Sequence, residues 1–168
     1  MHDHIDFVVS QWDNAMPDLD TASMRIFGRM LRLMKHLAKA RSEALAPFGF
    51  QEGEFDVLAT LRRAGSPYRL SPTQLYQSLL VTSGAMTNRL NRLEQQHLIE
   101  RVAAPDDKRS MLVGLTPQGQ QQIEQALRAH TAIQEAVLAP LAASERAELG
   151  GLLKTLLLAF PGEATAAE

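Results

Sequence analysis

Apolar residues recur along most of the chain at the three- and four-residue spacing of amphipathic helices. Proline or glycine interrupts this pattern at intervals, as expected where a helix begins or ends. The pattern predicts a mainly helical protein. The first expected helix ends before Met16-Pro17. Further helices are expected over about 22–45, 52–64, 72–80, 83–96 and 117–139. The last helix is expected to be capped by Ser144-Glu145 and to carry apolar residues to Phe160.

Two of these predicted helices, 72–80 and 83–96, are separated only by a tight turn. Ser71, Pro72 and Gln74 have the order of a capping box, with proline at the first helical position. Two short helices joined in this way form a helix-turn-helix, whose second helix can enter the major groove of DNA.

A β-hairpin is predicted directly after this helix pair. Residues 98–103 and 111–115 alternate between apolar and polar positions, and Pro105-Asp106-Asp107 between them is typical of a turn. The tip continues into Lys108 and Arg109, and cations on a protruding turn can enter a minor groove. The predicted fold class is therefore mainly α with a small β-hairpin wing, a winged helix-turn-helix.

The second helix of the pair has an outward face suited to DNA. Met86, Leu90 and Leu93 share one side and are expected to pack inward. The opposite side and its flanks carry amide, hydroxyl and guanidinium groups without a carboxylate, and such groups suit base edges and phosphates. These outward residues are Gly84, Thr87, Asn88, Asn91, Arg92 and Gln95.

The terminal helices carry more apolar surface than the small central module can cover. The helix over 22–45 alone would be about 35 Å long, and packing against a second copy would bury its apolar face. A monomeric helical bundle is the alternative. We therefore expect the chain to be divided into four parts. Dimerisation helices are expected over 1–45 and 117–160, a DNA-binding winged helix over 46–116, and a disordered tail over 161–168.

Composition narrows the possible functions. The chain has 168 residues, a net charge of −2 and no cysteine, which excludes disulfides and thiol-based zinc or redox chemistry. No nucleophile elbow, phosphate loop or metal-binding histidine pair is present, so neither an enzyme nor a cofactor or metal site is predicted. The first residues are acidic where a secretory signal would be basic, and we expect a cytoplasmic protein.

Three segments together resemble the MarR family of bacterial transcription regulators: LSPTQL from Leu70, SGAMTNRLNRLEQQHLIER from Ser83, and PDDKRSMLVGLTPQG from Pro105. The likeness extends over roughly 25–160. It implies a triangular homodimer with interleaved terminal helices, bound to a near-palindromic operator and often repressing an adjacent gene. One departure is His97, where the family often has glycine, so we expect the helix to end about one residue differently.

The resemblance also implies roles for single residues. Arg109 would be the minor-groove arginine and Asp107 its orienting partner, while Ser71 and Thr73 would meet phosphates. With the exposed wing tip, the predicted DNA-contacting residues are Ser71, Thr73, Ser83, Thr87, Asn88, Arg89, Arg92, Asp107, Lys108, Arg109 and Ser110.

Many MarR-like regulators release DNA when a small, often aromatic or phenolic anion binds between the dimer helices and the winged helix. Residues placed to form such a pocket are Arg32, Met34, His36 and Phe55, although the same residues would suit a core or a solvated face. Whether Trp12 serves the dimer or the ligand stays open. The functional alternative is a winged helix that binds proteins and not DNA.

Overall fold

A computed structural model of the chain describes residues 2–51, 53–79, 83–105 and 110–161, and shows a mainly helical fold with one small antiparallel sheet. The elements in chain order are α1 (His4–Ala15), α2 (Ala22–Leu45), the 3-10 turn η1 (Ala46–Phe48), α3 (Glu54–Arg63), β1 (Arg69–Leu70), α4 (Pro72–Leu79), α5 (Ser83–Gln95), β2 (Ile99–Ala103), β3 (Met111–Leu115), α6 (Pro117–Leu138) and α7 (Ala143–Leu157).

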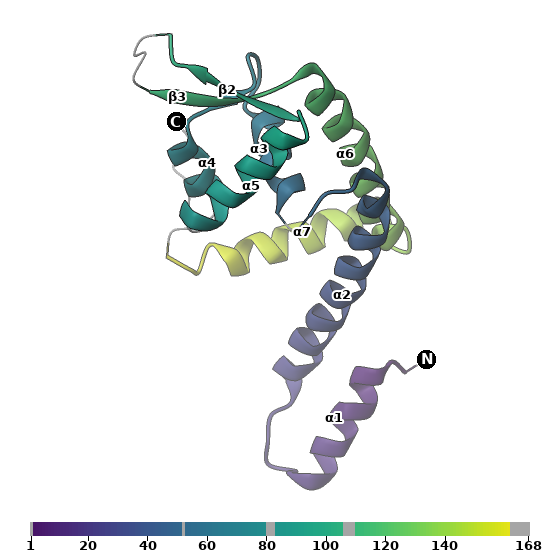
Figure 1. The fold of residues 1–168 in the computed structure, drawn as a ribbon. Coiled ribbons are helices and arrows are strands. Elements are labelled where there is room, and N and C mark those ends of the chain that lie inside the picture. Colours follow the sequence, from purple (N-terminus) through teal and green to yellow (C-terminus); the bar gives the residue numbers. More distant parts are fainter. Residues whose placement is uncertain (1, 52, 80–82, 106–109, 162–168) are drawn as a thin grey trace.

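The elements form a compact head and a projecting arm (Figure 1). The head contains α3, α4, α5 and the sheet, with α6 along one side. Helix α2 runs out of the head, and α1 folds back beside its far half. Helix α7 lies across the head, below α5 in this view. The predicted winged helix is therefore confirmed, and its helix pair and wing lie in the head.

The core of the head is an apolar cluster to which every one of its elements contributes. Leu58 and Leu61 of α3 and Leu75 of α4 are fully buried, and so is Leu93 of α5. Ile123 brings α6 into the same cluster. The three side chains expected to pack inward from the second helix, Met86, Leu90 and Leu93, are all 3% exposed or less. This burial fixes the orientation of α5 about its own axis.

The sheet has one strand more than the hairpin that the sequence predicts. Strands β2 and β3 pair antiparallel, with Arg101 opposite Val113, as expected for the wing. A two-residue strand, β1, pairs with the other edge of β3 through Leu70 opposite Val113. A strand of two residues is too short to show an alternation of apolar and polar positions in the sequence. It is recognised only by its pairing with β3.

Helix α5 ends where His97 takes a left-handed conformation, with φ of 58°. The Leu98 N–H donates to the Leu93 carbonyl at 3.0 Å, and the His97 N–H donates to the Glu94 carbonyl at 2.9 Å. This pair of bonds is a Schellman motif, which glycine normally completes. The expectation of a shifted helix end was wrong, because histidine occupies the glycine position and adopts its conformation.

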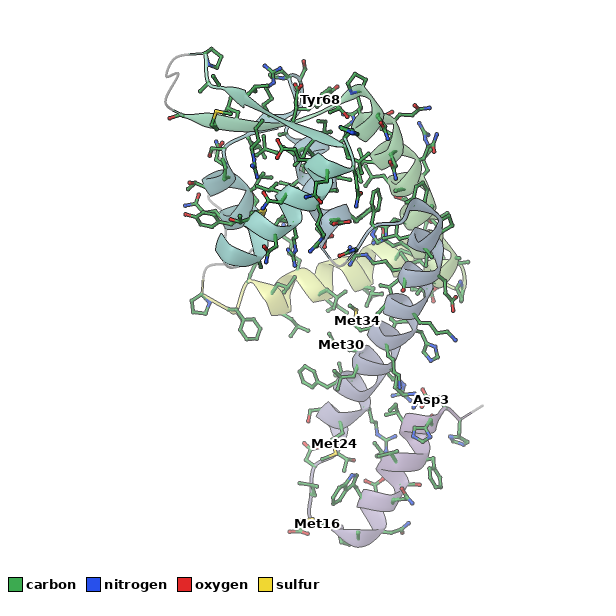
Figure 2. The ribbon with its side chains drawn as sticks, viewed as in Figure 1. Asp3, Met16, Met24, Met30, Met34 and Tyr68 are labelled. Atoms are coloured by element: carbon green, nitrogen blue, oxygen red, sulfur yellow. The ribbon has the colours of Figure 1, made fainter. Side chains whose placement is uncertain are left out.

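The arm is held together by apolar packing and by a group of ion pairs. Ile5 and Val9 of α1 are buried, and Ile5 lies against Gly28 of α2. Arg29 donates to the carboxylates of Asp3 and Asp6, both at 2.7 Å. Figure 2 shows Asp3 near the start of α1 beside α2, and Met24, Met30 and Met34 along α2.

These contacts shift the ionisation of the acidic partners. The Asp6 backbone N–H, followed by the Arg29 guanidinium, holds the pKa of the Asp3 carboxyl below its usual value. The Asp3 backbone N–H and then Arg29 do the same for the pKa of Asp6. Both carboxylates therefore stay charged at neutral pH, and the arm keeps its ion pairs there.

The cap of helix α7 is Ala142, two residues before the cap predicted at Ser144. Its first helical residue is Ala143, and the Glu145 carboxylate accepts a hydrogen bond from the Ala142 N–H at 2.7 Å. Glu145 therefore acts at the third helical position rather than beside the cap. No side chain of α7 is buried. Within the described part of the chain, no helix has the length and apolarity needed to cross a membrane.

Replacing His97 with glycine is expected to stabilise the protein, because glycine adopts a positive φ without a Cβ penalty. The free energy of unfolding should rise by about 0.5–1 kcal/mol, measured by urea denaturation. His97→Ala is the matched control: it removes the imidazole but keeps the Cβ, and it should give no such gain. Equal gains for both variants would contradict the backbone explanation.

Replacing Gly119 with alanine is expected to destabilise the protein. A Cβ at Gly119, in the first turn of α6, would overlap the backbone carbonyl of Leu98, and backbone there cannot yield as a flexible side chain could. The expected loss is about 1–3 kcal/mol or more of unfolding free energy. Gly84→Ala is the control, since outside its own helix turn no atom of the described residues lies within 4 Å of a Cβ placed there. A Gly119→Ala protein as stable as the control would refute the close approach.

Candidate nucleic-acid interface

The first part of the candidate interface is the start of α4. The Ser71 hydroxyl accepts from the Gln74 N–H at 3.2 Å, and the Gln74 side chain accepts from the Ser71 N–H at 2.8 Å, so the predicted capping box forms. Thr73 is exposed in the first turn. An exposed helix start presents backbone N–H groups and a partial positive charge, both of which attract phosphate.

The outward face of α5 is the second part. Burial of Met86, Leu90 and Leu93 leaves Thr87 and Asn88 exposed, together with Gly84 and Gln95. The helix begins at Ser83, and α4 lies next to it (Figure 1). The predicted hydroxyl and amide groups of Thr87, Asn88 and Gln95 are thus exposed along α5.

Arg92 sits on the flank of this face and is held by α3. Its Nε donates to the carboxylate of Glu54 at 2.8 Å, and the Arg92 side chain is 35% exposed while the Glu54 side chain is fully buried. The terminal nitrogens of the guanidinium are not used in this bond. Arg92 is therefore anchored through Nε while part of its side chain remains exposed.

Arg89 points toward the start of α3 rather than straight outward. It is half-buried, and a Cβ added at Gly53 would overlap its guanidinium. Gly53 has φ of 76°, so both its conformation and this close approach favour glycine. Arg89 and Arg92 are thus both half-buried, whereas Thr87 and Asn88 are exposed.

The wing is attached to α5 through polar side chains. Arg101 of β2 donates to the Asn91 side-chain oxygen at 2.7 Å and pairs with Glu94 at 3.2 Å. Asn91, expected on the outward face, thus also braces the wing. Ser110 is exposed, and its carbonyl accepts from the Ala104 N–H at 2.8 Å. The predicted tip residues Asp107, Lys108 and Arg109 lie outside the described residues.

Two cavities between helices are candidates for the predicted effector pocket. The first is about 700 Å³ and lies where α2, α3 and α5 meet; Arg41, Phe50, Phe55, Asp56 and Arg89 are among its lining residues. The second is about 660 Å³ and lies between α1 and α2, with Arg32, His36 and Leu149 in its wall. The four residues predicted for one pocket are not brought together: Phe55 lines the first cavity, Arg32 and His36 line the second, and Met34 lines neither.

The first cavity has a cationic and aromatic wall. Arg41 donates to Asp56 at 2.6 Å and lies 5.2 Å from the centre of the Phe55 ring. The Phe55 ring also packs against the His130 ring, with 5.1 Å between ring centres. Arg41 Nε and His130 Nδ1 are buried and find no hydrogen-bond partner among the described residues. Burial, and then the charge of Arg41, lowers the pKa of His130, which keeps it uncharged at neutral pH.

Three residues at these sites were not predicted from the sequence. Arg41 and Asp56 come from different helices, and no sequence signal pairs them. Glu54 did carry a signal, because it shares a helical face with the buried Leu58 and Leu61, and a carboxylate there needs a cation. Among the described residues, no group of three or more acidic or histidine side chains could hold a metal ion.

Comparison with known proteins assigns the chain to a family. A family model described as the MarR family matches residues 48–110. The regulator PecS of Dickeya dadantii is 34% identical over 87% of this chain and 88% of its own length. The multiple antibiotic resistance protein MarR of Escherichia coli is 32% identical over 77% of this chain and 90% of its own length.

Solved structures agree with this assignment. The crystal structure of a mutant MarR from E. coli complexed with operator DNA matches with a TM-score of 0.66 and 29% identity, covering 87% of this chain and 97% of that chain. YusO of Bacillus subtilis matches with a TM-score of 0.68 at 24% identity, covering 85% of this chain and 99% of that chain, which supports the fold alone. The relatives are transcription regulators and not enzymes. The chain belongs to the MarR family of DNA-binding transcription regulators.

Proposed function

We propose that this regulator is a cytoplasmic homodimeric repressor that binds a near-palindromic operator and releases it when a small aromatic anion binds. The observation that carries the DNA-binding part is the exposed hydroxyl and amide face at the start of α5, next to the capped start of α4. The relative crystallised with operator DNA supports the same partner. The alternative of a protein-interaction module without DNA binding is disfavoured by family membership.

The DNA contacts fall into two kinds. Thr87 and Asn88, with Ser83, would read base edges in the major groove, since amide and hydroxyl groups form specific pairs there. Ser71 and Thr73 would contact phosphates, as would Arg89 and Arg92 from the flank of the helix. In the wing, we propose that Arg109 enters the minor groove with Asp107 as its orienting partner. Lys108 and Ser110 of the wing tip would also contact DNA.

A second copy would cover the apolar surface of the arm and of α7. On α2, Phe27, Leu31 and Met34 are 57%, 72% and 59% exposed. On α7, Leu152 and Leu156 are 59% and 48% exposed. Large apolar surfaces of this kind in soluble proteins are covered by a partner. A two-fold dimer would place two copies of α5 about 34 Å apart, one turn of the duplex.

The effector would bind in the first cavity. Arg41 and Arg89 offer positive charge to an anion, and Phe50 and Phe55 offer aromatic surface. Because Arg89 belongs to α5, a ligand there would contact the DNA-reading helix directly. A ligand that prefers a different position of α5 would weaken DNA binding by its difference in affinity for the two states. Arg32 and His36 make the second cavity the other candidate.

Selection from a random duplex pool tests the DNA-binding proposal. The wild-type protein should enrich an inverted repeat with half-sites about one turn apart. Asn88→Ala should bind the selected duplex more weakly and discriminate less at one base position, by about 1–3 kcal/mol. Thr73→Ala should weaken binding to all sequences without changing stability, because its side chain is exposed.

Gln121→Ala on α6 is the control for these variants, since it removes another exposed amide far along the chain from α5. Enrichment of no duplex would overturn the operator proposal. Unchanged affinity and base preference for Asn88→Ala would remove that residue from the interface. A selected single half-site without a repeat would contradict the dimer.

Replacing Arg41 with methionine tests the effector site. Among benzoate and phenol derivatives, at least one should release the wild-type protein from its selected duplex, measured by fluorescence anisotropy. Arg41→Met should reduce sensitivity to that compound by about tenfold or more, because it removes a charged hydrogen-bond donor from the cavity. Arg63→Met is the control, since Arg63 is exposed on α3 outside the cavity. Equal sensitivity in both variants would place the effector elsewhere.

A further inference from the structure

Glu54 is a carboxylate in the interior of the DNA-binding head. It is the first residue of α3 and is fully buried, on the same side of the helix as Leu58 and Leu61. Its two oxygens have different partners: one accepts from Arg92 Nε and the other from the Gln51 N–H, both at 2.8 Å. The carboxylate therefore joins the loop before α3 to the helix α5.

A buried carboxylate holds its partners strongly, because a charge in the interior is costly unless it is paired and hydrogen-bonded. Arg92 is the cation that meets Glu54, and the bond is made at Nε, close to the stem of the side chain. This holds the guanidinium at one nitrogen, while the Arg92 side chain remains 35% exposed. An orienting carboxylate of this kind lowers the entropy that an arginine loses when it binds another group.

We propose that Glu54 is a positioning residue for DNA binding: it acts through Arg92 to fix the orientation of α5 and to present the Arg92 guanidinium to the duplex. Glu54 itself does not touch DNA, since its side chain is fully buried. The proposal rests on the operator binding proposed above. It adds a residue from α3, outside the helix-turn-helix, to the determinants of operator affinity.

The competing explanation is that Glu54 only caps the start of α3 through the Gln51 N–H. Capping would affect stability and leave operator affinity unchanged at a temperature where the protein is folded. The change in operator affinity when Glu54 loses its charge separates capping from positioning. Removing a negative charge near the DNA-binding helix would by simple electrostatics strengthen binding to a polyanion, whereas loss of positioning weakens it.

The test compares Glu54→Gln with Glu124→Gln in the 168-residue chain, using the duplex that the wild type selects. Glu124 is the control because it accepts from Arg62 Nε at the same 2.8 Å, between α3 and α6, with its own side chain 35% exposed. We expect Glu54→Gln to weaken operator binding about tenfold or more, in line with a lost charged hydrogen bond. Glu124→Gln should bind as the wild type does, even if its melting temperature falls.

Arg92→Lys provides a second readout if Glu54→Gln folds poorly. Lysine keeps the positive charge for phosphate but has no Nε in the plane of a guanidinium. A positioning role predicts weaker binding for Arg92→Lys, with a salt dependence close to that of the wild type. It also predicts that adding Glu54→Gln to Arg92→Lys weakens binding little further, because both changes remove the same interaction.

The outcomes distinguish this inference from the proposed function. If the wild-type protein selects no duplex, the operator proposal fails and this inference fails with it. If a duplex is selected and folded Glu54→Gln binds it as well as or better than the wild type, only the positioning role is overturned. The positioning role would also be overturned if Arg92→Lys kept full operator affinity. Strictly additive losses of affinity in the variant that combines Glu54→Gln with Arg92→Lys would overturn it too.

Discussion

The burial of one side of α5 is the contact on which the DNA-binding surface depends. Met86, Leu90 and Leu93 lie in the same apolar cluster as the residues of α3. Successive helical residues are about 100° apart, so turning α5 by one residue would carry Asn88 toward the core and expose a leucine. An amide buried without partners would cost several kcal/mol by order of magnitude. Hydrophobic packing therefore decides which polar groups the helix presents.

Polar contacts then hold this orientation from both sides. Glu54 anchors α5 to α3 through Arg92, and Arg101 anchors it to the wing through Asn91 and Glu94. The Schellman motif at His97 ends the helix where β2 must begin, and the Thr116 hydroxyl donates to the His97 carbonyl at 2.7 Å. The helix is thus fixed at its flank and at its end, which preserves the geometry that specific base contacts require.

The arm and α7 differ from the head in what stabilises them. The head buries its own core, whereas α2 buries only Leu45 and α7 buries no side chain. Ion pairs between α1 and α2 hold the arm in shape without covering its apolar face. The first cavity lies at the junction of these two parts, so a ligand there would act on the connection between the proposed dimer surface and α5.

The sequence by itself determined the helices, the capping box at Ser71, the hairpin and the inward face of α5. These follow from local rules: helical periodicity, cap chemistry and strand alternation act over a few residues. Even the exposed amide face of α5 could be read as the complement of its apolar side. The carboxylate of Glu54 on the buried side of α3 was visible too, although its partner was not.

Tertiary structure alone decided which distant residues meet. The short strand β1 exists because β3 offers it an edge, and His97 adopts a positive φ because the chain must turn there into β2. The pairs Arg92–Glu54 and Arg41–Asp56 join residues 38 and 15 positions apart. Tertiary structure also decided that Phe55 lines one cavity while Arg32 and His36 line another. Contacts between elements depend on how helices pack in three dimensions, and local periodicity contains no information about that packing.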